Sequence, residues 1–102
     1  MKTLSIIVLT LLIYASCKKE GQAPVITLLG NDPAETGAGY PYHDAGATAH
    51  DEEDGDITSK IVVQSTVDTS KIGTYQVTYN VTDSDGQKAV EVKREVIVKY
   101  FK

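Results

Sequence analysis

Few of the residues that form cross-links and metal sites occur in this sequence of 102 residues. It has one cysteine, two histidines and no tryptophan. A lone thiol excludes an internal disulfide bond, so packing must stabilise the fold. His43 and His50 stand in no metal-ligand spacing, and we expect both at the surface. The formal net charge of −4 argues against nucleic-acid binding, which depends on Lys and Arg side chains that neutralise phosphates.

Long apolar runs are also missing, and the one apolar segment lies at the start of the chain. Residues 4–14 are apolar apart from single serine and threonine interruptions. This segment is shorter than the roughly 18 residues that a membrane-spanning helix needs, so we expect no ordinary transmembrane helix. Lys2 precedes it, and the small residues Ala15 and Ser16 follow it. That layout is typical of a bacterial secretory signal.

The only thiol, Cys17, follows directly after these small residues. Residues 15–17 resemble a lipobox, the site at which bacterial lipoproteins are cut and lipidated, although Tyr14 stands where leucine is usual. The resemblance implies a signal peptide over residues 1–16 and lipid attached to Cys17. Two or three acyl chains, at about 0.8 kcal/mol per buried methylene, make a stable membrane anchor. The alternative is an incidental cysteine behind a cut elsewhere.

Residues 17–23 are expected to form a lipidated polar tether. Within them Lys18, Lys19 and Glu20 partly resemble the export signal of Bacteroidetes surface lipoproteins, which is lysine followed by acidic residues. The resemblance favours display on the surface of the outer membrane. The alternative is an anchor that faces the periplasm.

The clearest strand signal lies at residues 74–82. Tyr75, Val77, Tyr79 and Val81 share one face, and polar residues share the other. Strict alternation of this kind predicts a strand with one face on a core and one face in water.

The next run, residues 89–100, repeats this alternation, and the turn at residues 83–86 predicts an antiparallel hairpin between the two runs. The apolar face of the second run is expected to hold Val90, Val92, Val96, Val98 and Tyr100. Arg94 falls on this same face. Either a bulge shifts the register there, or the long side chain reaches out at the rim of the sheet.

Weaker strand signals occur at residues 25–29, 46–50 and 60–66, and no amphipathic helical stretch follows the apolar start. Short strands separated by regular turns favour two packed sheets. The expected fold is therefore all-β, an Ig-like antiparallel β-sandwich of about seven strands over residues 24–102.

Four phrases of the sequence support this assignment. They are "PVITLLG" from Pro24, "GATAHDEEDGDIT" from Gly46, "DTSKIGTYQVTYNVTDSDG" from Asp68 and "AVEVKREVIV" from Ala89. In this order they resemble the bacterial Ig-like domain family named for its occurrence in a pesticidal crystal protein, and Arg94 fits the family pattern.

This interpretation gives structural roles to Tyr75, Gly73 and Gly55. Tyr75, behind Gly73, stands where Ig-like sandwiches often have a tyrosine corner, in which the phenol bonds a main-chain group a few residues upstream. Val77 then stands where true Ig domains have a cysteine. Gly55 belongs to a "DGD" signature that the resemblance marks as structural, since glycine supplies an unusual φ in a turn.

The acidic segment at residues 51–56 is the most charged feature. Asp51, Asp54 and Asp56 could hold Ca²⁺, which takes several carboxylate and carbonyl oxygens, and Asp83 and Asp85 could contribute from a neighbouring loop. The alternative is a solvated turn in which the Asp side chains bond their own main chain.

Tyr40 and Tyr42 could form an aromatic platform for a sugar ring, or they could pack within their loop. No nucleophile elbow surrounds any serine, and a sandwich of this size leaves little room for a cleft with paired carboxylates. We therefore expect that the protein is not an enzyme and that it binds no cofactor apart from the possible Ca²⁺.

The resulting functional hypothesis is a non-enzymatic cell-envelope lipoprotein with a single Ig-like domain. Its partners are the membrane, through the lipid anchor, and an envelope protein or glycan bound at the surface. The alternatives are an accessory structural subunit that docks on a larger envelope complex through a strand edge, and a carbohydrate-binding module.

Overall fold

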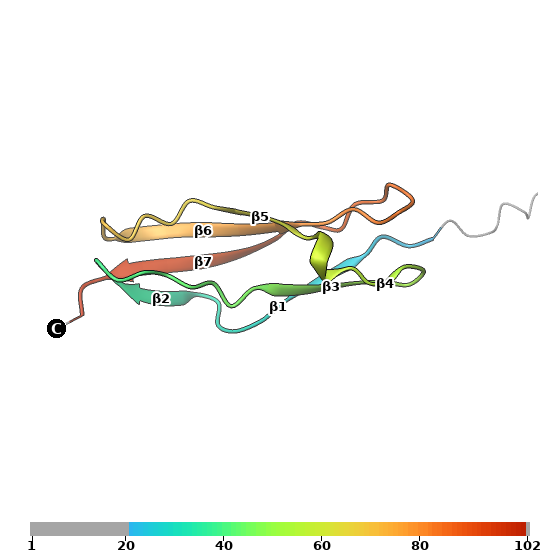
Figure 1. The fold of residues 1–102 in the computed structure, drawn as a ribbon. Helices are drawn as coiled ribbons and strands as arrows, with labels where there is room; N and C mark the ends of the chain where they lie inside the picture. The colour runs from blue at the N-terminus through green and yellow to red at the C-terminus, as the bar shows by residue number, and fades with distance from the viewer. Residues whose placement is uncertain (1–20, 102) are drawn as a thin grey trace, which may run out of the picture.

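The computed structural model describes residues 21–101. This part of the chain consists of seven β-strands and one short 3₁₀ helix (Figure 1). The strands are β1 (Val25–Leu28), β2 (Ala34–Gly37), β3 (Ala47–Asp51), β4 (Gly55–Asp56), β5 (Val62–Ser65), β6 (Gly73–Asn80) and β7 (Val92–Lys99), and the 3₁₀ helix η1 covers Thr58–Lys60. The all-β class and the number of strands agree with the prediction. Within residues 21–101, no helix is long and apolar enough to cross a lipid bilayer.

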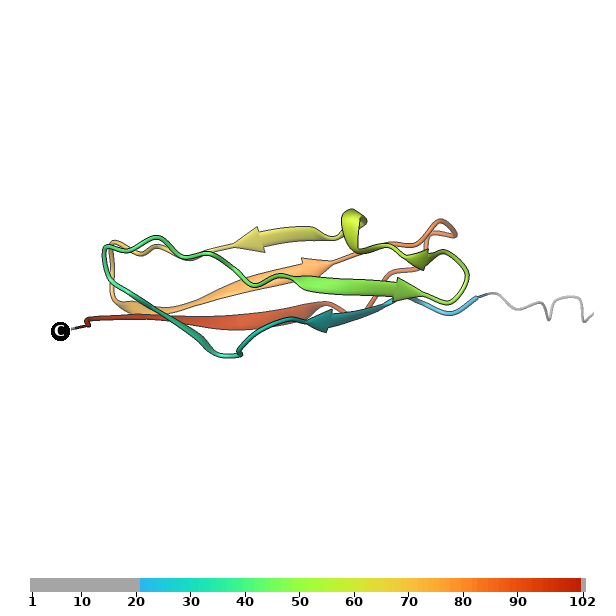
Figure 2. The ribbon, with the colours of Figure 1, turned by 60° about the horizontal axis from the view of Figure 1, so that its bottom comes forward.

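The strands form two sheets that pack face to face (Figures 1 and 2). One sheet has the order β1-β3-β4, and the other has the order β2-β7-β6-β5. The pairings are antiparallel except that β2 runs parallel to β7. This one pair differs from the expected antiparallel arrangement. The chain crosses from the first sheet to the second between β1 and β2 without reversing its direction, so β2 joins the edge of β7 in parallel.

The core lies between the sheets and follows the predicted alternation of β6. Val77, Tyr79 and Val81 are buried, as predicted, and Tyr75 on the same face is half-buried. Ile26, Ala47, Ala49, Ile57, Ala89, Val96 and Val98 complete the buried apolar set. The predicted hairpin is also present, because β6 and β7 pair in one continuous antiparallel register from Gly73↔Val98 to Tyr79↔Val92.

Strand β7 corrects three predictions. Val90 and Tyr100 are 85% and 76% exposed, because they lie just outside the strand, where no facing sheet covers them. Arg94 pairs with Val77 in unbroken register, so there is no bulge, and its side chain is 0% exposed, so it does not reach out at the rim. The guanidinium lies inside the sandwich.

The sequence did not predict β2 or β4. Both strands are only two to four residues long and contain glycine, so they show no strand pattern in the sequence. The two ends of the described chain lie at opposite ends of the sandwich. The N-terminal segment enters at one end of the sandwich, whereas β7 leads to the opposite end (Figure 2). We call this second end the distal end.

Candidate functional site

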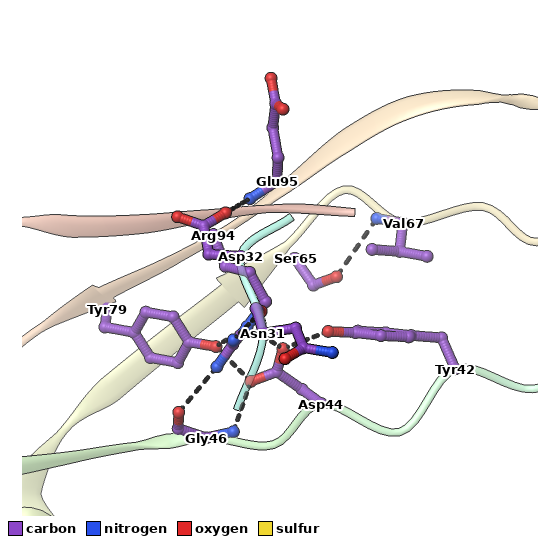
Figure 3. A network of polar contacts seen from close by, with 10 residues as sticks. All are labelled: Asn31, Asp32, Tyr42, Asp44, Gly46, Ser65, Val67, Tyr79, Arg94 and Glu95. Atoms are coloured by element: carbon purple, nitrogen blue, oxygen red, sulfur yellow. Dashed lines mark hydrogen bonds and ion pairs between the residues drawn. The ribbon is translucent and has the colours of Figure 1, made fainter. Parts of the chain in front are cut away.

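A cluster of polar side chains crosses the core around Arg94 (Figure 3). Arg94 Nε lies 3.0 Å from Asp44 Oδ1 and 3.2 Å from the Tyr79 hydroxyl. Its Nη1 donates to the main-chain oxygen of Asn31 at 2.5 Å, and its Nη2 donates to that of Gly46 at 2.8 Å. The guanidinium is therefore surrounded by acceptors from several segments, which is what a fully buried cation requires.

Asp44 is the anionic centre of this cluster. Its carboxylate accepts hydrogen bonds from the Tyr42 hydroxyl at 2.6 Å, from the Gly46 main-chain nitrogen at 2.9 Å and from the Tyr79 hydroxyl. The Arg94 cluster thus consists of Asn31, Tyr42, Asp44, Gly46, Tyr79 and Arg94. It joins the segments before β2 and β3 to β6 and β7.

The pKa values of the cluster reflect this mutual stabilisation. Burial by itself would raise the pKa of Asp44, but hydrogen bonds from Tyr42, Tyr79 and Gly46 and the charge of Arg94 bring it below its ordinary value. Burial and the neighbouring Asp44 raise the pKa values of Tyr42 and Tyr79. The cluster therefore holds an ionised Asp44 against neutral tyrosines at neutral pH.

A surface hollow of about 480 Å³ lies beside the cluster, with Tyr42, His43, Glu35 and Arg94 among its lining residues. The polar groups that reach it from the cluster are already hydrogen-bonded to one another. Their arrangement fits a structural connection between the sheets, not general acid–base chemistry.

Tyr42 and Tyr40, predicted as a possible pair, have separate surroundings. Tyr42 is half-buried and turns toward Asp44, whereas Tyr40 is 60% exposed. The aromatic neighbour of Tyr40 is Phe101. A Cβ placed on Gly37 would lie 2.7 Å from Tyr40 Cδ2 and 2.9 Å from Phe101 Cδ2, so both rings lie directly against this glycine.

The carboxylates of the acidic residues proposed for Ca²⁺ each accept a hydrogen bond from a main-chain nitrogen. Asp51 Oδ2 accepts from the nitrogens of Glu53 and Asp54 at 3.0 and 2.8 Å. The Asp54 carboxylate accepts from the nitrogen and the hydroxyl of Ser84, both at 2.8 Å, and Asp56 Oδ1 accepts from the Thr58 nitrogen at 2.9 Å. The contacts of Asp51 and Asp56 match the turn alternative, whereas Asp54 bonds the neighbouring loop at Ser84.

Asp83, in the neighbouring loop, also bonds main-chain nitrogens. Asp83 Oδ1 accepts from the nitrogens of Asp85 and Gln87. Asp51 Oδ1 is buried without a hydrogen-bond partner, but Ca²⁺ takes six to eight oxygens. Among residues 21–101 no group of three His, Cys, Asp or Glu side chains could hold a metal ion. The Ca²⁺ site at Asp51, Asp54 and Asp56 therefore stays a prediction from the sequence.

The predicted structural residues lie at the turns. The Tyr75 hydroxyl donates to the Lys71 carbonyl at 2.8 Å, the contact that defines a tyrosine corner. Gly73 begins β6 directly before this corner. Gly55 has a φ of 80°, which lies in the left-handed region that favours glycine.

Other predicted residues carry less information. His43 and His50 are both exposed. Cys17 and the signal segment lie outside the described residues. Sequence reasoning missed Asp44 as the partner of Arg94. The available signal was the inward parity of Arg94, since a cation on the core face of a strand requires an acceptor on the opposite layer.

Comparison with known proteins agrees with this geometry. The family model for "Bacterial surface protein, Ig-like domain" matches residues 26–98. The pesticidal crystal protein Cry22Aa of Bacillus thuringiensis is 51% identical over 57 residues, which represent 52% of this chain and 8% of that protein.

Solved structures extend the comparison. The lipoprotein BT2262 of Bacteroides thetaiotaomicron has a TM-score of 0.64 at 22% identity, over 78% of this chain and 39% of that one, which shows the shared fold. The structure of CBM51-2 in complex with GlcNAc and INT domains from Clostridium perfringens ZmpB has a TM-score of 0.61 at 34% identity, over 76% of this chain and 17% of that one. This chain spans well under two thirds of each relative. Since the family model covers more than half of it, the chain belongs to the bacterial surface protein Ig-like domain family.

Proposed function

We propose that this chain is a non-enzymatic lipoprotein of the cell envelope, anchored through lipid on Cys17, whose Ig-like domain binds a partner at the cell surface. Its family consists of bacterial surface domains that are typically non-catalytic. A Bacteroides lipoprotein shares the fold. The outer membrane is the proposed location, and its outer face is the proposed side.

The observation that carries the proposal is the placement of the chain ends. The described chain enters at one end of the sandwich, and the segments around Ala38, Thr69 and Lys99 meet at the distal end, where hydrogen bonds join them (Figure 2). An anchor before residue 21 would hold the first end at the membrane and present the distal end to the surroundings. The Arg94 cluster ties the two sheets together between them.

Fractionation and surface digestion test this proposal. The full chain with a C-terminal epitope is compared with Cys17→Ala and with the control Ser16→Ala, which keeps a small residue at the cleavage site. We expect the unmodified chain and Ser16→Ala in the outer-membrane fraction, where protease added to intact cells digests them. We expect Cys17→Ala in the soluble fraction. Protection until the outer membrane is opened would indicate the periplasmic side. Identical fractionation of all three proteins would contradict the anchor.

A second candidate function is docking on a larger envelope complex through the edge of β5. This strand lies at the outside of the four-stranded sheet, and all four of its residues are exposed. Val63 is 51% exposed although it lies opposite the buried Tyr79 on the inner face. An unpaired strand edge offers main-chain donors and acceptors to an added strand.

Site-specific crosslinking distinguishes this candidate. A photoreactive residue at Val63 is compared with one at Val90, which is exposed in the loop between β6 and β7. Docking through β5 predicts a discrete crosslinked envelope protein from position 63 alone. Equal or absent crosslinking at both positions would count against it.

A further inference from the structure

Two exposed aromatic rings lie side by side at the distal end, against the same glycine. Tyr40 is 60% exposed and Phe101 is 55% exposed, and both rings approach Gly37 more closely than a Cβ would allow. The glycine therefore leaves room for both rings, and a side chain at position 37 would force at least one of them to move. We call Gly37, Tyr40 and Phe101 the distal aromatic pair.

The main chain fixes the position of the pair. The Tyr40 nitrogen donates to the Gly37 oxygen at 3.0 Å, and the Gly39 nitrogen donates to the Thr69 oxygen at 2.8 Å. The Ala38 nitrogen donates to the Lys99 oxygen at 2.9 Å, which fixes the segment that leads to Phe101. The rings are thus carried by an ordered turn that is bonded to two other segments.

Other apolar side chains are also exposed at the distal end. Ile72 and Tyr100, from the same end of the sandwich, are also more than half exposed. Exposed apolar side chains that gather at one end of a domain are typical of an interaction site. Aromatic rings with hydroxyl groups suit a ligand that has both apolar and hydrogen-bonding faces.

The charges around the pair are of both signs. Lys99 Nζ lies 3.1 Å from Glu35 Oε1, and Lys71 lies near Asp68. Lys99, which lies two residues before Phe101, is thus paired with an acid, and this pairing disfavours an anionic ligand. A neutral sugar fits this surface, because a pyranose ring offers an apolar face of C–H groups to an aromatic ring and hydroxyls to its rim.

We propose that the distal aromatic pair is a stacking site for an uncharged glycan. This inference rests on the proposed function, since it names the class of partner that the surface domain binds. It differs from the pair Tyr40 and Tyr42 expected from the sequence, because Tyr42 belongs to the Arg94 cluster.

The test uses the full chain, exported from a bacterial host and extracted in mild detergent. Binding to neutral cello-, chito- and manno-oligosaccharides and to a sulfated heparin oligosaccharide is measured by a glycan array. Amide shifts of Gly37, Gly39 and Phe101 are then followed by NMR during titration. We expect millimolar or tighter binding of at least one neutral oligosaccharide, with the largest shifts at these amides.

Variants locate the site. Tyr40→Ala and Phe101→Ala should each weaken the affinity about tenfold, whereas Tyr40→Phe, which keeps the ring, should retain most of it. Gly37→Ala should weaken binding although both rings remain. Val90→Ala, an exposed apolar residue far from the pair, is the matched control, and thermal melts show whether each variant remains folded.

Three results would overturn the inference. These are no binding of any neutral oligosaccharide at millimolar concentration, binding of the sulfated oligosaccharide alone, and neutral-glycan binding that is equal in Tyr40→Ala and Val90→Ala. The last result would leave the proposed function intact with its site elsewhere. A surface-exposed, Cys17-anchored protein that binds none of the sugars would also leave the proposed location standing.

Discussion

Arg94 on β7 and Asp44, two residues before Gly46, form an ion pair with an Nε–Oδ1 distance of 3.0 Å. The pair connects the four-stranded sheet to the segment that leads into β3 of the other sheet. Arg94 is wholly buried, and it pairs in register with Val77, where the family resemblance implies valine in place of a disulfide cysteine. In a chain with one cysteine, the Arg94 cluster connects the two sheets in the absence of a disulfide.

Loss of the anion should be costly. Asp44→Asn leaves the Arg94 guanidinium buried without its counter-charge. Removing one partner of a buried ion pair lowers the free energy of unfolding by about 3 kcal/mol or more. Urea unfolding measures this change. The matched control is Glu95→Gln, which changes an exposed acid on β7, the strand of Arg94. Equal midpoints for the two variants would contradict the role assigned to Asp44.

Replacement of both partners should cost less than loss of one. In Arg94→Met/Asp44→Ala no unpaired charge remains, and apolar replacement of a buried ion pair is often close to neutral. We expect the double variant to unfold at a higher urea concentration than Asp44→Asn. A double variant that is less stable than either single variant would show that Arg94 acts through its contacts to Asn31 and Gly46 instead.

Acid should remove the contribution of Asp44. Its pKa in the folded protein lies below the ordinary value of 3.8, so the stabilisation is complete above pH 3.8 and is lost as the pH falls through the folded value. The difference in unfolding free energy between the unmodified chain and Asp44→Asn should therefore shrink in acid. Urea titrations at a series of pH values measure it. A difference that stays constant down to about pH 2 would contradict the ionised state of Asp44.

The tyrosine corner predicts a smaller effect. Tyr75→Phe removes only the hydrogen bond to the Lys71 carbonyl. A typical intramolecular hydrogen bond contributes about 1 kcal/mol, so the melting temperature should fall by a few degrees. Tyr100→Phe, at an exposed position, should leave it unchanged. Identical melting curves for the two variants would show that the Tyr75 hydrogen bond does not stabilise the fold.

The acidic loop should not respond to Ca²⁺. Asp51, Asp54 and Asp56 each accept main-chain hydrogen bonds, which already stabilise their negative charges without an ion. A bound ligand must raise stability, so melts in millimolar Ca²⁺ and in EGTA should coincide. A higher melting temperature in Ca²⁺ that disappears in Asp51→Asn would restore the calcium site.

The sequence predicted the parts of the fold that depend on alternation. β6 places Tyr75, Val77 and Tyr79 on one face, and the facing sheet buries Val77 and Tyr79. β2 and β4 have too few residues to show a period, and they form only because β7 and β3 offer an adjacent edge. The local sequence of β2 or β4 does not show that a strand edge lies beside it.

The site was harder to predict than the fold. Arg94 signalled a buried cation by its parity, but its partner Asp44 lies 50 positions earlier in the sequence. The pairing of Tyr40 with Phe101 is equally remote, and the two meet only because the Gly37 segment ends beside the end of β7. Contacts across the sandwich depend on the topology, which a single sequence does not give.

Mass spectrometry of the exported protein tests the central claim most directly. The account predicts that the mature chain begins at Cys17 and that its sulfur carries a diacylglyceryl group, with further acylation of the freed amine. Detection of an unmodified Cys17 thiol in the exported chain, or of a mature chain that begins at another residue, would contradict it.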